Sequence, residues 1–265
     1  MNVNLTLVLT LNFSKYHGTG NDFILIDDMG EQQQLREEQI KFLCHRRFGI
    51  GADGLILLRP SAEAHFKMVY YNSDGRLSTM CGNGGRCLAH FAWQGGHAEQ
   101  QMRFEAIDGL HRAELLPSGE VKLQMGDAPA PQPHGNDWTV DTGSPHFLRF
   151  CPEDPGPDFI TLAQSIRQAP PFAAEGINVN FLWFDEQSWQ MRTFERGVES
   201  ETYSCGTGAT AAALLLNQHQ GLASPVKLGT PGGELQVEFE RTDGGYQQVF
   251  LLGPAQAVYR GSIEL

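Results

Sequence analysis

Cys81-Gly-Asn-Gly-Gly-Arg-Cys87 and Cys205-Gly-Thr-Gly-Ala-Thr-Ala211 are two distant segments of this chain with the same design. In each, a cysteine stands immediately before a glycine-punctuated turn, and a helix-forming run follows. The first turn of a helix presents unpaired backbone N–H groups and a positive dipole end, which together stabilise a thiolate and bind an anion. Two such ends that face each other would place a thiol on each side of a small acidic molecule. A racemase or epimerase requires that geometry.

Length and composition favour two domains. The chain has 265 residues, 41% of them hydrophobic, and its 30 glycines and 14 prolines are spread along the sequence. Two domains of about 120–130 residues agree with the usual domain size better than one large core does. We therefore predict domains at residues 1–127 and 128–254, with the boundary in the proline-rich stretch 126–135.

The charge of the chain argues against a nucleic-acid partner. Lys and Arg total 19 against 31 Asp and Glu, which gives a formal net charge of -12. Binding a phosphate backbone needs a basic surface, so a small-molecule substrate is the better interpretation, although acidity also serves plain solubility. No stretch approaches the ~20 apolar residues that cross a bilayer, and we expect no membrane partner. The apolar start of the chain, up to Leu11, is interpreted as an edge strand or a start-site extension.

Short period-two runs bounded by Gly, Asn, Asp and Pro predict that strands dominate each half. These runs lie at 13–16, 65–71, 121–125, 179–184, 190–195, 235–239 and 248–252. Helical periodicity is confined to 35–47, 81–94, 161–169 and 205–218. The second and fourth of these are apolar most of the way round, which is typical of helices inside a core. Each half is therefore predicted to be a curved sheet around one central helix, an α+β architecture.

The five cysteines are Cys44, Cys81, Cys87, Cys151 and Cys205, an odd number that favours reduced thiols in a cytoplasm. Cys87 falls on another side of its helix from Cys81 and is expected in the core, whereas Cys44 and Cys151 carry no motif. A zinc site would need closely paired cysteines that the sequence lacks, so no metal is predicted. A disulfide or redox pair between Cys81 and Cys205 remains a second interpretation of the duplicated motif.

Other polar residues have both a structural and a functional interpretation. Asn21 and Asn72 lie in turn-forming segments, and their amides suit either the turn itself or a ligand. Glu195 and Arg196 are either a solvated pair on the surface or part of the site. In the second interpretation Arg196 binds a substrate carboxylate in bidentate fashion, and Glu195 orients or activates a neighbouring thiol. His146 is a titratable residue beside a further turn.

Eight segments, in order, resemble the successive signatures of the diaminopimelate epimerases, which act without pyridoxal phosphate. They are Lys15-Tyr-His-Gly-Thr-Gly-Asn-Asp-Phe, Gly49-Ile-Gly-Ala-Asp-Gly-Leu-Ile, Tyr71-Asn-Ser-Asp-Gly, Cys81-Gly-Asn-Gly-Gly-Arg-Cys, Gly143-Ser-Pro-His, Gly176-Ile-Asn-Val-Asn-Phe, Phe194-Glu-Arg-Gly and Cys205-Gly-Thr-Gly-Ala. The resemblance implies interconversion of LL- and meso-2,6-diaminopimelate for lysine and peptidoglycan synthesis, with no cofactor. It also implies two pseudo-symmetric domains with a cleft between them, a homodimer, and a final strand near 255–265 that returns to the first domain.

The resemblance also implies roles for individual residues. Cys81 and Cys205 correspond to the two acid/base residues. The backbone groups that hold the reacting carboxylate correspond to Gly82, Asn83, Gly206 and Thr207. The residues that read the rest of the substrate correspond to Asn21, Asn72, Asn178, Glu195 and Arg196. His146 and Glu195 correspond to groups that set the protonation of the thiols.

Two positions depart from the pattern, and other functions remain open. Family members commonly have Asn where Ser144 stands and often Gln where Gly54 follows Asp53, so the grip on the substrate is expected to change slightly there. A racemase of histidine or of a shorter diamino acid would share the two thiols. A non-catalytic thiol or metal-binding protein is the alternative from a different class, and metal analysis separates it from an enzyme.

Overall fold

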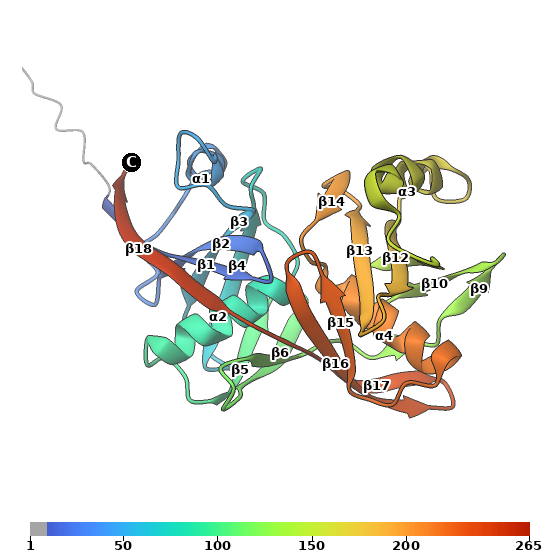
Figure 1. The fold of residues 1–265 in the computed structure, drawn as a ribbon. Helices are drawn as coiled ribbons and strands as arrows, with labels where there is room; N and C mark the ends of the chain where they lie inside the picture. The colour runs from blue at the N-terminus through green and yellow to red at the C-terminus, as the bar shows by residue number, and fades with distance from the viewer. Residues whose placement is uncertain (1–9) are drawn as a thin grey trace, which may run out of the picture.

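The computed structural model describes residues 10–265, which form two halves side by side (Figure 1). The helices are α1 (Glu37–Cys44), α2 (Gly82–Gln94), α3 (Phe159–Gln168) and α4 (Gly206–Gln220), with a short 3₁₀ turn at Gly156–Asp158. All four helices lie where the periodicity predicts them. None of the helices described within residues 10–265 is long and apolar enough to cross a membrane.

Strands are the commonest regular structure in both halves. In the first half they are β1 (Thr10–Gly18), β2 (Asn21–Asp27), β3 (Gly54–Arg59), β4 (Phe66–Asn72), β5 (Gln101–Ala106), β6 (Gly109–Leu115) and β7 (Val121–Gln124). The remaining strands are β8 (Ala128–Pro129), β9 (Gln132–His134), β10 (Asp137–Asp141), β11 (Pro145–Phe150), β12 (Asn178–Phe184), β13 (Trp189–Glu195), β14 (Ser200–Thr202), β15 (Val226–Thr230), β16 (Gly233–Thr242), β17 (Gly245–Gly253) and β18 (Gln256–Glu264). The sequence predicts an edge strand or an extension at the start of the chain. Residues 1–9 of that segment lie outside the described residues, and β1 begins at Thr10.

The two halves repeat one connection pattern. In the first half, β1 and β2 are antiparallel, α1 leads to a parallel β3, β4 turns back, and α2 leads to a parallel β5 followed by antiparallel β6 and β7. In the second half, β10, β11, α3, β12, β13, α4, β15, β16 and β17 follow with the same relative directions. This repeat confirms the predicted α+β fold of two pseudo-symmetric domains with mixed sheets.

Strand pairing joins the two halves at two places. β17 is antiparallel to β7, so the last strands of the two repeats meet. β18 then runs back across the molecule and pairs with β1, from Thr10 opposite Glu264 to His17 opposite Gln256 (Figure 1). The proline-rich stretch at 126–135 contains the short strands β8 and β9, and β8 pairs with β17. The exact domain limits stay a prediction.

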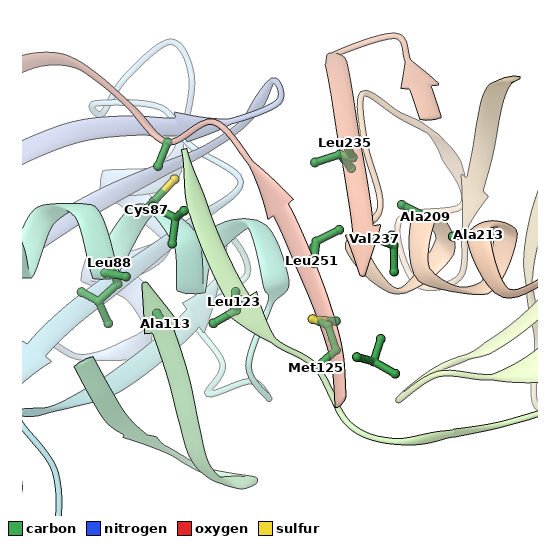
Figure 2. Close-up of a cluster of buried hydrophobic side chains, with 14 of the residues drawn as sticks. Cys87, Leu88, Ala113, Leu123, Met125, Ala209, Ala213, Leu235, Val237 and Leu251 are labelled. Carbon is green, nitrogen blue, oxygen red and sulfur yellow. The ribbon is translucent and has the colours of Figure 1, made fainter. Parts of the chain in front are cut away.

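One apolar cluster extends from α2 to α4 (Figure 2). Cys87 and Leu88 of α2 pack with strands of the first half, and Ala209 and Ala213 of α4 pack with strands of the second half. Leu251 on β17 lies between the two groups and is fully buried. Burying a leucine of this kind stabilises the fold by about 1.5–3 kcal/mol. The central helices therefore share one core, and their N-termini are held by it.

Candidate active site

Cys81 and Cys205 are the N-cap residues of α2 and α4. Both have an extended backbone, with φ -104° and ψ 126° at Cys81 and φ -124° and ψ 116° at Cys205. Their carbonyl groups accept the first helical bonds, from the N–H of Gly85 at 2.7 Å and of Ala209 at 2.9 Å. The amides of the residues between each cysteine and that donor have no acceptor in their own helix. Each thiol thus stands beside a cluster of unpaired N–H groups.

The two helix N-termini meet at their glycines. A methyl group added to Gly206 would lie 3.7 Å from Cα of Gly82 and only 2.8 Å from Cδ2 of Leu251. A methyl group on Gly82 would lie 3.2 Å from that same leucine atom. A side chain at Gly206 would thus force a shift, and one at Gly82 would be tightly packed. The structure thus places the first turns of the two motifs against each other.

A buried set of hydroxyl and amide groups ties the two helix starts together. Asn83 Nδ2 donates to Ser204 Oγ at 3.0 Å and to the Ser204 carbonyl at 3.2 Å. Ser204 Oγ lies 2.6 Å from Thr19 Oγ1 and donates to the Thr19 carbonyl at 3.0 Å. Arg86 Nη2 donates to Thr19 Oγ1 at 3.3 Å. Because Ser204 immediately precedes Cys205, this network fixes one thiol-bearing turn against the other.

On the Cys81 side, the nearest polar partner is Asn21. The Cys81 thiol lies 3.6 Å from Asn21 Oδ1, and Asn83 Nδ2 donates to the same oxygen at 3.3 Å. Asn21 begins β2, directly after the β1–β2 turn, so the strand pairing places its side chain in front of the start of α2. Of the residues expected in the site, Asn21, Cys81 and Asn83 are thus in direct contact.

On the Cys205 side, Thr207 connects the thiol to a buried histidine. Thr207 Oγ1 lies 3.4 Å from Cys205 Sγ and 2.9 Å from His146 Nε2. Asn180 Nδ2 lies 3.1 Å from the other ring nitrogen, Nδ1, and Asn180 Oδ1 accepts a hydrogen bond from Thr193 Oγ1 at 2.9 Å. Asn180 Nδ2 also donates to the Phe147 carbonyl at 2.9 Å, and because a carbonyl only accepts, this contact fixes which end of the amide faces the ring.

Burial and the helix N-termini act in opposite directions on the pKa values of the two thiols. Desolvation raises the pKa of Cys205 to about 12, and the nearby Glu195 carboxylate acts in the same direction. Desolvation also raises the pKa of Cys81, with the N–H of Gly84 acting against it. Glu195 itself is half-buried, and desolvation raises the pKa of its carboxyl group. The helix N-termini oppose the desolvation but do not outweigh it.

Asn178 and Arg196 lie beside this group. Asn178 Oδ1 accepts a hydrogen bond from the backbone N–H of Arg196 at 2.8 Å, and Asn178 Nδ2 donates to Ser144 Oγ at 2.9 Å. Ser144, at the position where family members commonly have asparagine, therefore supports the side chain of Asn178 through a hydrogen bond. The Arg196 side chain is exposed, and its Nη1 donates to the Glu175 carbonyl at 3.3 Å.

Asn72 and Gly54 are paired across strands β4 and β3. Asn72 is exposed at the end of its strand, and no side-chain hydrogen bond joins it to the thiol-bearing turns in residues 10–265. A methyl group on Gly54 would lie 2.5 Å from the ring of Tyr70, so that ring fills the space where a longer side chain is expected. Charges at Cys81 and Glu195 act on the Tyr70 hydroxyl, which places it near the site.

Sequence reasoning missed several residues that the fold brings to these turns. Thr19 and Asn180 lie in two of the eight signature segments but were given no role, and Ser204 lies in none of them although it directly precedes Cys205. Asp53 appeared in the sequence only as the residue before Gly54, yet its Oδ2 accepts a hydrogen bond from Asn21 Nδ2 at 2.7 Å. The sequence does contain one signal that could have identified these residues as part of the site. Each is a polar residue that lies next to a motif cysteine or within a glycine-containing signature segment.

Comparison with known proteins identifies the family. The family model described as diaminopimelate epimerase matches residues 13–130 and 138–258. The chain belongs to the diaminopimelate epimerase family. The diaminopimelate epimerase of Flavobacterium psychrophilum is 42% identical over 255 residues, covering 94% of this chain and 98% of the relative. That of Chlorobaculum tepidum is 42% identical over 262 residues, covering 94% and 99%. The chain is accordingly an enzyme of the isomerase class.

Solved structures with low sequence identity share the fold. A PhzF-family phenazine biosynthesis protein from Bacillus anthracis superposes with a TM-score of 0.71 at 15% identity, covering 96% of this chain and 99% of that one. A hydroxyproline epimerase from Agrobacterium vitis gives a TM-score of 0.68 at 14% identity, covering 97% and 93%. Members of the diaminopimelate epimerase family thus share this two-domain architecture with proteins of other names.

Proposed function

We propose that this enzyme converts LL-2,6-diaminopimelate to the meso isomer by a two-base mechanism in which Cys81 and Cys205 exchange protons with one α-carbon. The single observation that carries the proposal is that the two cysteines cap helices whose first glycines meet, Gly206 lying against Gly82. A thiol then stands on each side of the place where the substrate's α-carbon would bind. The product would serve the synthesis of lysine and of peptidoglycan precursors. This role places the enzyme in the cytoplasm as part of the proposal.

The chemistry needs no cofactor if the site stabilises the charge that develops. One sulfur, as thiolate, takes the α-proton from one face, and the other, as thiol, gives its proton to the opposite face. The C–H bond breaks toward the first sulfur, and a new C–H bond forms from the second. Negative charge moves meanwhile onto the α-carboxylate, where the N–H groups around Gly82, Asn83, Gly206 and Thr207 would meet it. In the reverse direction the two sulfurs exchange roles.

Other residues would bind the part of the substrate that does not react. The exposed guanidinium of Arg196 is free to pair with the distal carboxylate in bidentate fashion. The amides of Asn21, Asn72 and Asn178 would bind its ammonium and carboxylate groups. Glu195, whose charge acts on both thiols, would help to set their protonation, as would His146 through Thr207.

We also propose a homodimer that forms through β18. Among the described strands, β18 pairs only with β1, and its other edge is unpaired. Val258 and Tyr259 on this strand are 56% and 46% exposed. An exposed edge with apolar side chains favours pairing with a second copy. Light scattering on the purified enzyme measures this state directly.

The decisive test is proton NMR of LL-diaminopimelate with the purified, reduced enzyme in D2O. We expect the α-proton signal to disappear while the meso isomer forms. Cys81→Ala and Cys205→Ala should each lower the rate of epimerisation by at least the 10²–10⁴-fold that is typical for loss of a general acid or base, about 3–5 kcal/mol of barrier. Cys151→Ala, which changes a half-buried thiol outside the site, is the matched control and should keep full activity.

Each outcome separates the alternatives. Near-normal turnover in either active-site variant would contradict the two-base mechanism. No exchange with diaminopimelate, but exchange with histidine or a shorter diamino acid, would assign another racemase activity. No exchange with any amino acid, together with stoichiometric zinc in metal analysis, would support the metal-binding alternative. In residues 10–265, no three His, Cys, Asp or Glu side chains are grouped to hold a metal ion.

A further inference from the structure

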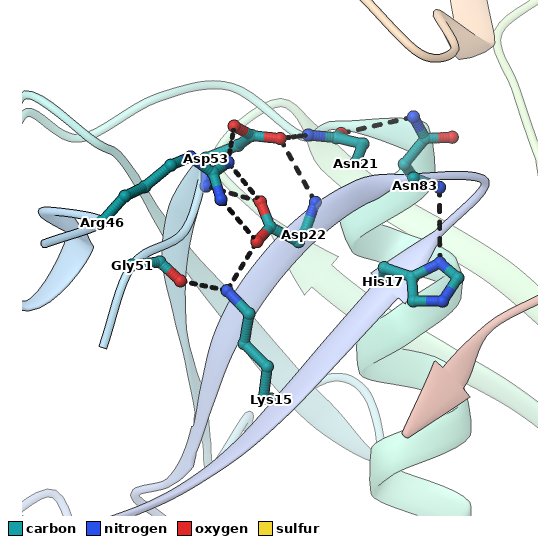
Figure 3. A network of polar contacts seen from close by, with 9 residues as sticks. Lys15, His17, Asn21, Asp22, Arg46, Gly51, Asp53 and Asn83 are labelled. Carbon is teal, nitrogen blue, oxygen red and sulfur yellow. Dashed lines mark hydrogen bonds and ion pairs between the residues drawn. The ribbon is translucent and has the colours of Figure 1, made fainter. Parts of the chain in front are cut away.

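An ion cluster beside Cys81 contains charged groups to which the proposed reaction gives no role (Figure 3). Lys15 Nζ lies 2.7 Å from Asp22 and also donates to the Gly51 carbonyl. Arg46 holds both oxygens of Asp22, at 3.0 and 2.7 Å, and lies 2.6 Å from Asp53 Oδ1. The two cations and two carboxylates balance in charge. Asp22 contacts both cations, whereas Asp53 contacts Arg46 through one oxygen and has its other oxygen available for a second purpose.

The carboxylate of Asp53 connects this cluster to the site. Arg46 fixes its Oδ1, while its Oδ2 accepts hydrogen bonds from Asn21 Nδ2 at 2.7 Å and from the Asp22 N–H at 3.2 Å. An ionised carboxylate only accepts hydrogen bonds, so the Asn21 atom that faces it must be the amide nitrogen. The orientation of the Asn21 amide is thus decided by Asp53, which the cluster holds in place.

The other end of the Asn21 amide faces the thiol. Its Oδ1 lies 3.6 Å from Cys81 Sγ and accepts a hydrogen bond from Asn83 Nδ2 at 3.3 Å. Asn83 supports this orientation independently, because its Nδ2 also donates to the Ser204 carbonyl and must be the nitrogen. An amide oxygen accepts a hydrogen bond from S–H and offers none to a thiolate. The arrangement therefore stabilises the protonated form of Cys81.

We propose that Asp53 is a positioning residue, which locks the Asn21 amide with its oxygen toward Cys81 and so favours the protonated thiol of that cysteine. If the thiol of Cys81 is protonated, Cys81 begins the catalytic cycle as the acid, and this consequence rests on the proposed function. The orientation of the amide does not depend on that function. The inference thus gives the two chemically similar cysteines different polar partners, an amide oxygen at Cys81 and the Thr207 hydroxyl at Cys205.

Other groups also act on Cys81, and the test must separate them from Asp53. Glu195 on β13 and Arg86 on α2 act on the sulfur through their charge, and the N–H groups of Gly84 and Asn83 act through hydrogen bonds. Tyr70 on β4, Cys87 on α2 and Cys205 before α4 are the titratable groups on which Cys81 itself acts. Asp53 differs from all of these because it acts through the orientation of an intervening amide. Removal of Asn21 therefore abolishes the effect of Asp53 and leaves direct charge effects in place.

The experiment measures the rate at which iodoacetamide alkylates Cys81 in the full-length enzyme, quantified by mass spectrometry of the Cys81 peptide across pH 7–10. In Asp53→Ala the amide of Asn21 loses its 2.7 Å contact with the carboxylate and keeps only the longer, 3.3 Å contact with Asn83. The amide can then turn its N–H toward the sulfur, which favours the thiolate. At pH values below the midpoint of the Cys81 titration, we expect the alkylation rate to rise about tenfold relative to wild type. This is the equivalent of lowering the pKa of Cys81 by one unit. Asp53→Asn keeps the size of the side chain and should change the rate in the same direction. Arg46 would pair with the new amide oxygen, so the new N–H group would face Asn21 and favour the orientation in which the oxygen of Asn21 faces residue 53.

Asp28→Ala is the matched control. Asp28 follows β2 at its far end, about 20 Å along the strand from Asn21, and pairs with Arg59 at 2.8 Å. Loss of that ion pair should lower stability without changing the rate of Cys81 alkylation. Adding Asp53→Ala to Asn21→Ala should likewise leave the rate of the single Asn21 variant unchanged.

Three results would overturn the proposal. These are an unchanged rate in both Asp53 variants, an equal rise in Asp28→Ala, and a further tenfold rise when Asp53→Ala is added to Asn21→Ala. Failure of the wild-type enzyme to epimerise diaminopimelate is a separate result, since it would refute the proposed function while the alkylation rates still report the orientation of Asn21.

Discussion

At the scale of single residues, His146 shows how burial decides protonation. The imidazole is fully buried, and desolvation lowers its pKa to about 3. Asn180 Nδ2 lies 3.1 Å from Nδ1, and Nε2 lies 2.9 Å from Thr207 Oγ1 and 3.5 Å from Asn178 Nδ2, so the neutral ring is in hydrogen-bonding contact on both sides. The sequence suggested a histidine that titrates beside the thiols. The structure instead contains a neutral imidazole that orients the Thr207 hydroxyl next to Cys205.

This burial predicts acid sensitivity of the fold. The unfolded chain protonates the histidine near its ordinary pKa of 6.5, whereas the folded state does so only near 3. The stabilisation is therefore fully present above pH 6.5 and is lost as the pH falls toward 3, by about 1.4 kcal/mol per pH unit. Urea denaturation at pH 7 and pH 5 should show a smaller loss of unfolding free energy in His146→Gln than in wild type. His65→Gln, at an exposed site, is the control, and an equal loss in all three proteins would contradict the assignment.

At the scale of secondary-structure elements, glycine gives the two motif helices room to begin. Glycine in a helix interior costs about 1 kcal/mol relative to alanine. In α2, a methyl group on Gly84 would lie 3.0 Å from Ile56, and one on Gly85 would lie 3.0 Å from Leu123. The glycines therefore let the helix start lie against the sheet. The sequence identified both helices and their first turns correctly because motif and periodicity are local signals.

Gly208→Ala tests this close approach. The added methyl group would lie 2.7 Å from Asn180 Oδ1 and 3.4 Å from Cys205 Sγ. We expect a loss of about 1–3 kcal/mol in unfolding free energy, as in other overpacked sites, and a fall in epimerisation because the start of α4 must shift. Gly126→Ala, where the methyl group meets nothing within 4 Å, is the control for both measurements. An increase in stability, as helix propensity alone predicts, would show that the site has spare room.

The parts of the site that the sequence did not predict depend on contacts between elements. Ser204 and Thr19 are 185 positions apart in the chain, yet their hydroxyl oxygens lie 2.6 Å apart. No pattern within one segment encodes such a distance, because it follows from how the two halves pack. The same reason applies to the pKa values of the two cysteines. Helix ends are visible in the sequence, whereas the burial that opposes them exists only in the folded molecule.

At the scale of the whole molecule, buried thiols are distributed over separate parts of the fold. Cys87 belongs to the cluster shared by α2 and α4, Cys44 to a second cluster under α1, and Cys205 to the junction of the halves. Desolvation raises the pKa of each to about 12 from an ordinary value of 9.0. The three thiols thus share one physical property although only Cys205 belongs to the proposed site.

The enzyme should therefore lose stability in alkaline solution. Above pH 9 the unfolded chain releases thiol protons that the folded chain retains, so the stabilisation is complete below pH 9 and is lost as the pH rises through 12. Each buried thiol contributes a slope of about 1.4 kcal/mol per pH unit within that interval. Urea denaturation at pH 8.5 and 10.5 should show a smaller alkaline loss in Cys44→Ala and in Cys87→Ala than in wild type, even though both variants start from lower stability. Cys151→Ala, which changes a half-buried thiol, should retain most of the loss. Equal losses in wild type and in both variants would mean that these thiols ionise as readily in the folded enzyme as in the unfolded chain.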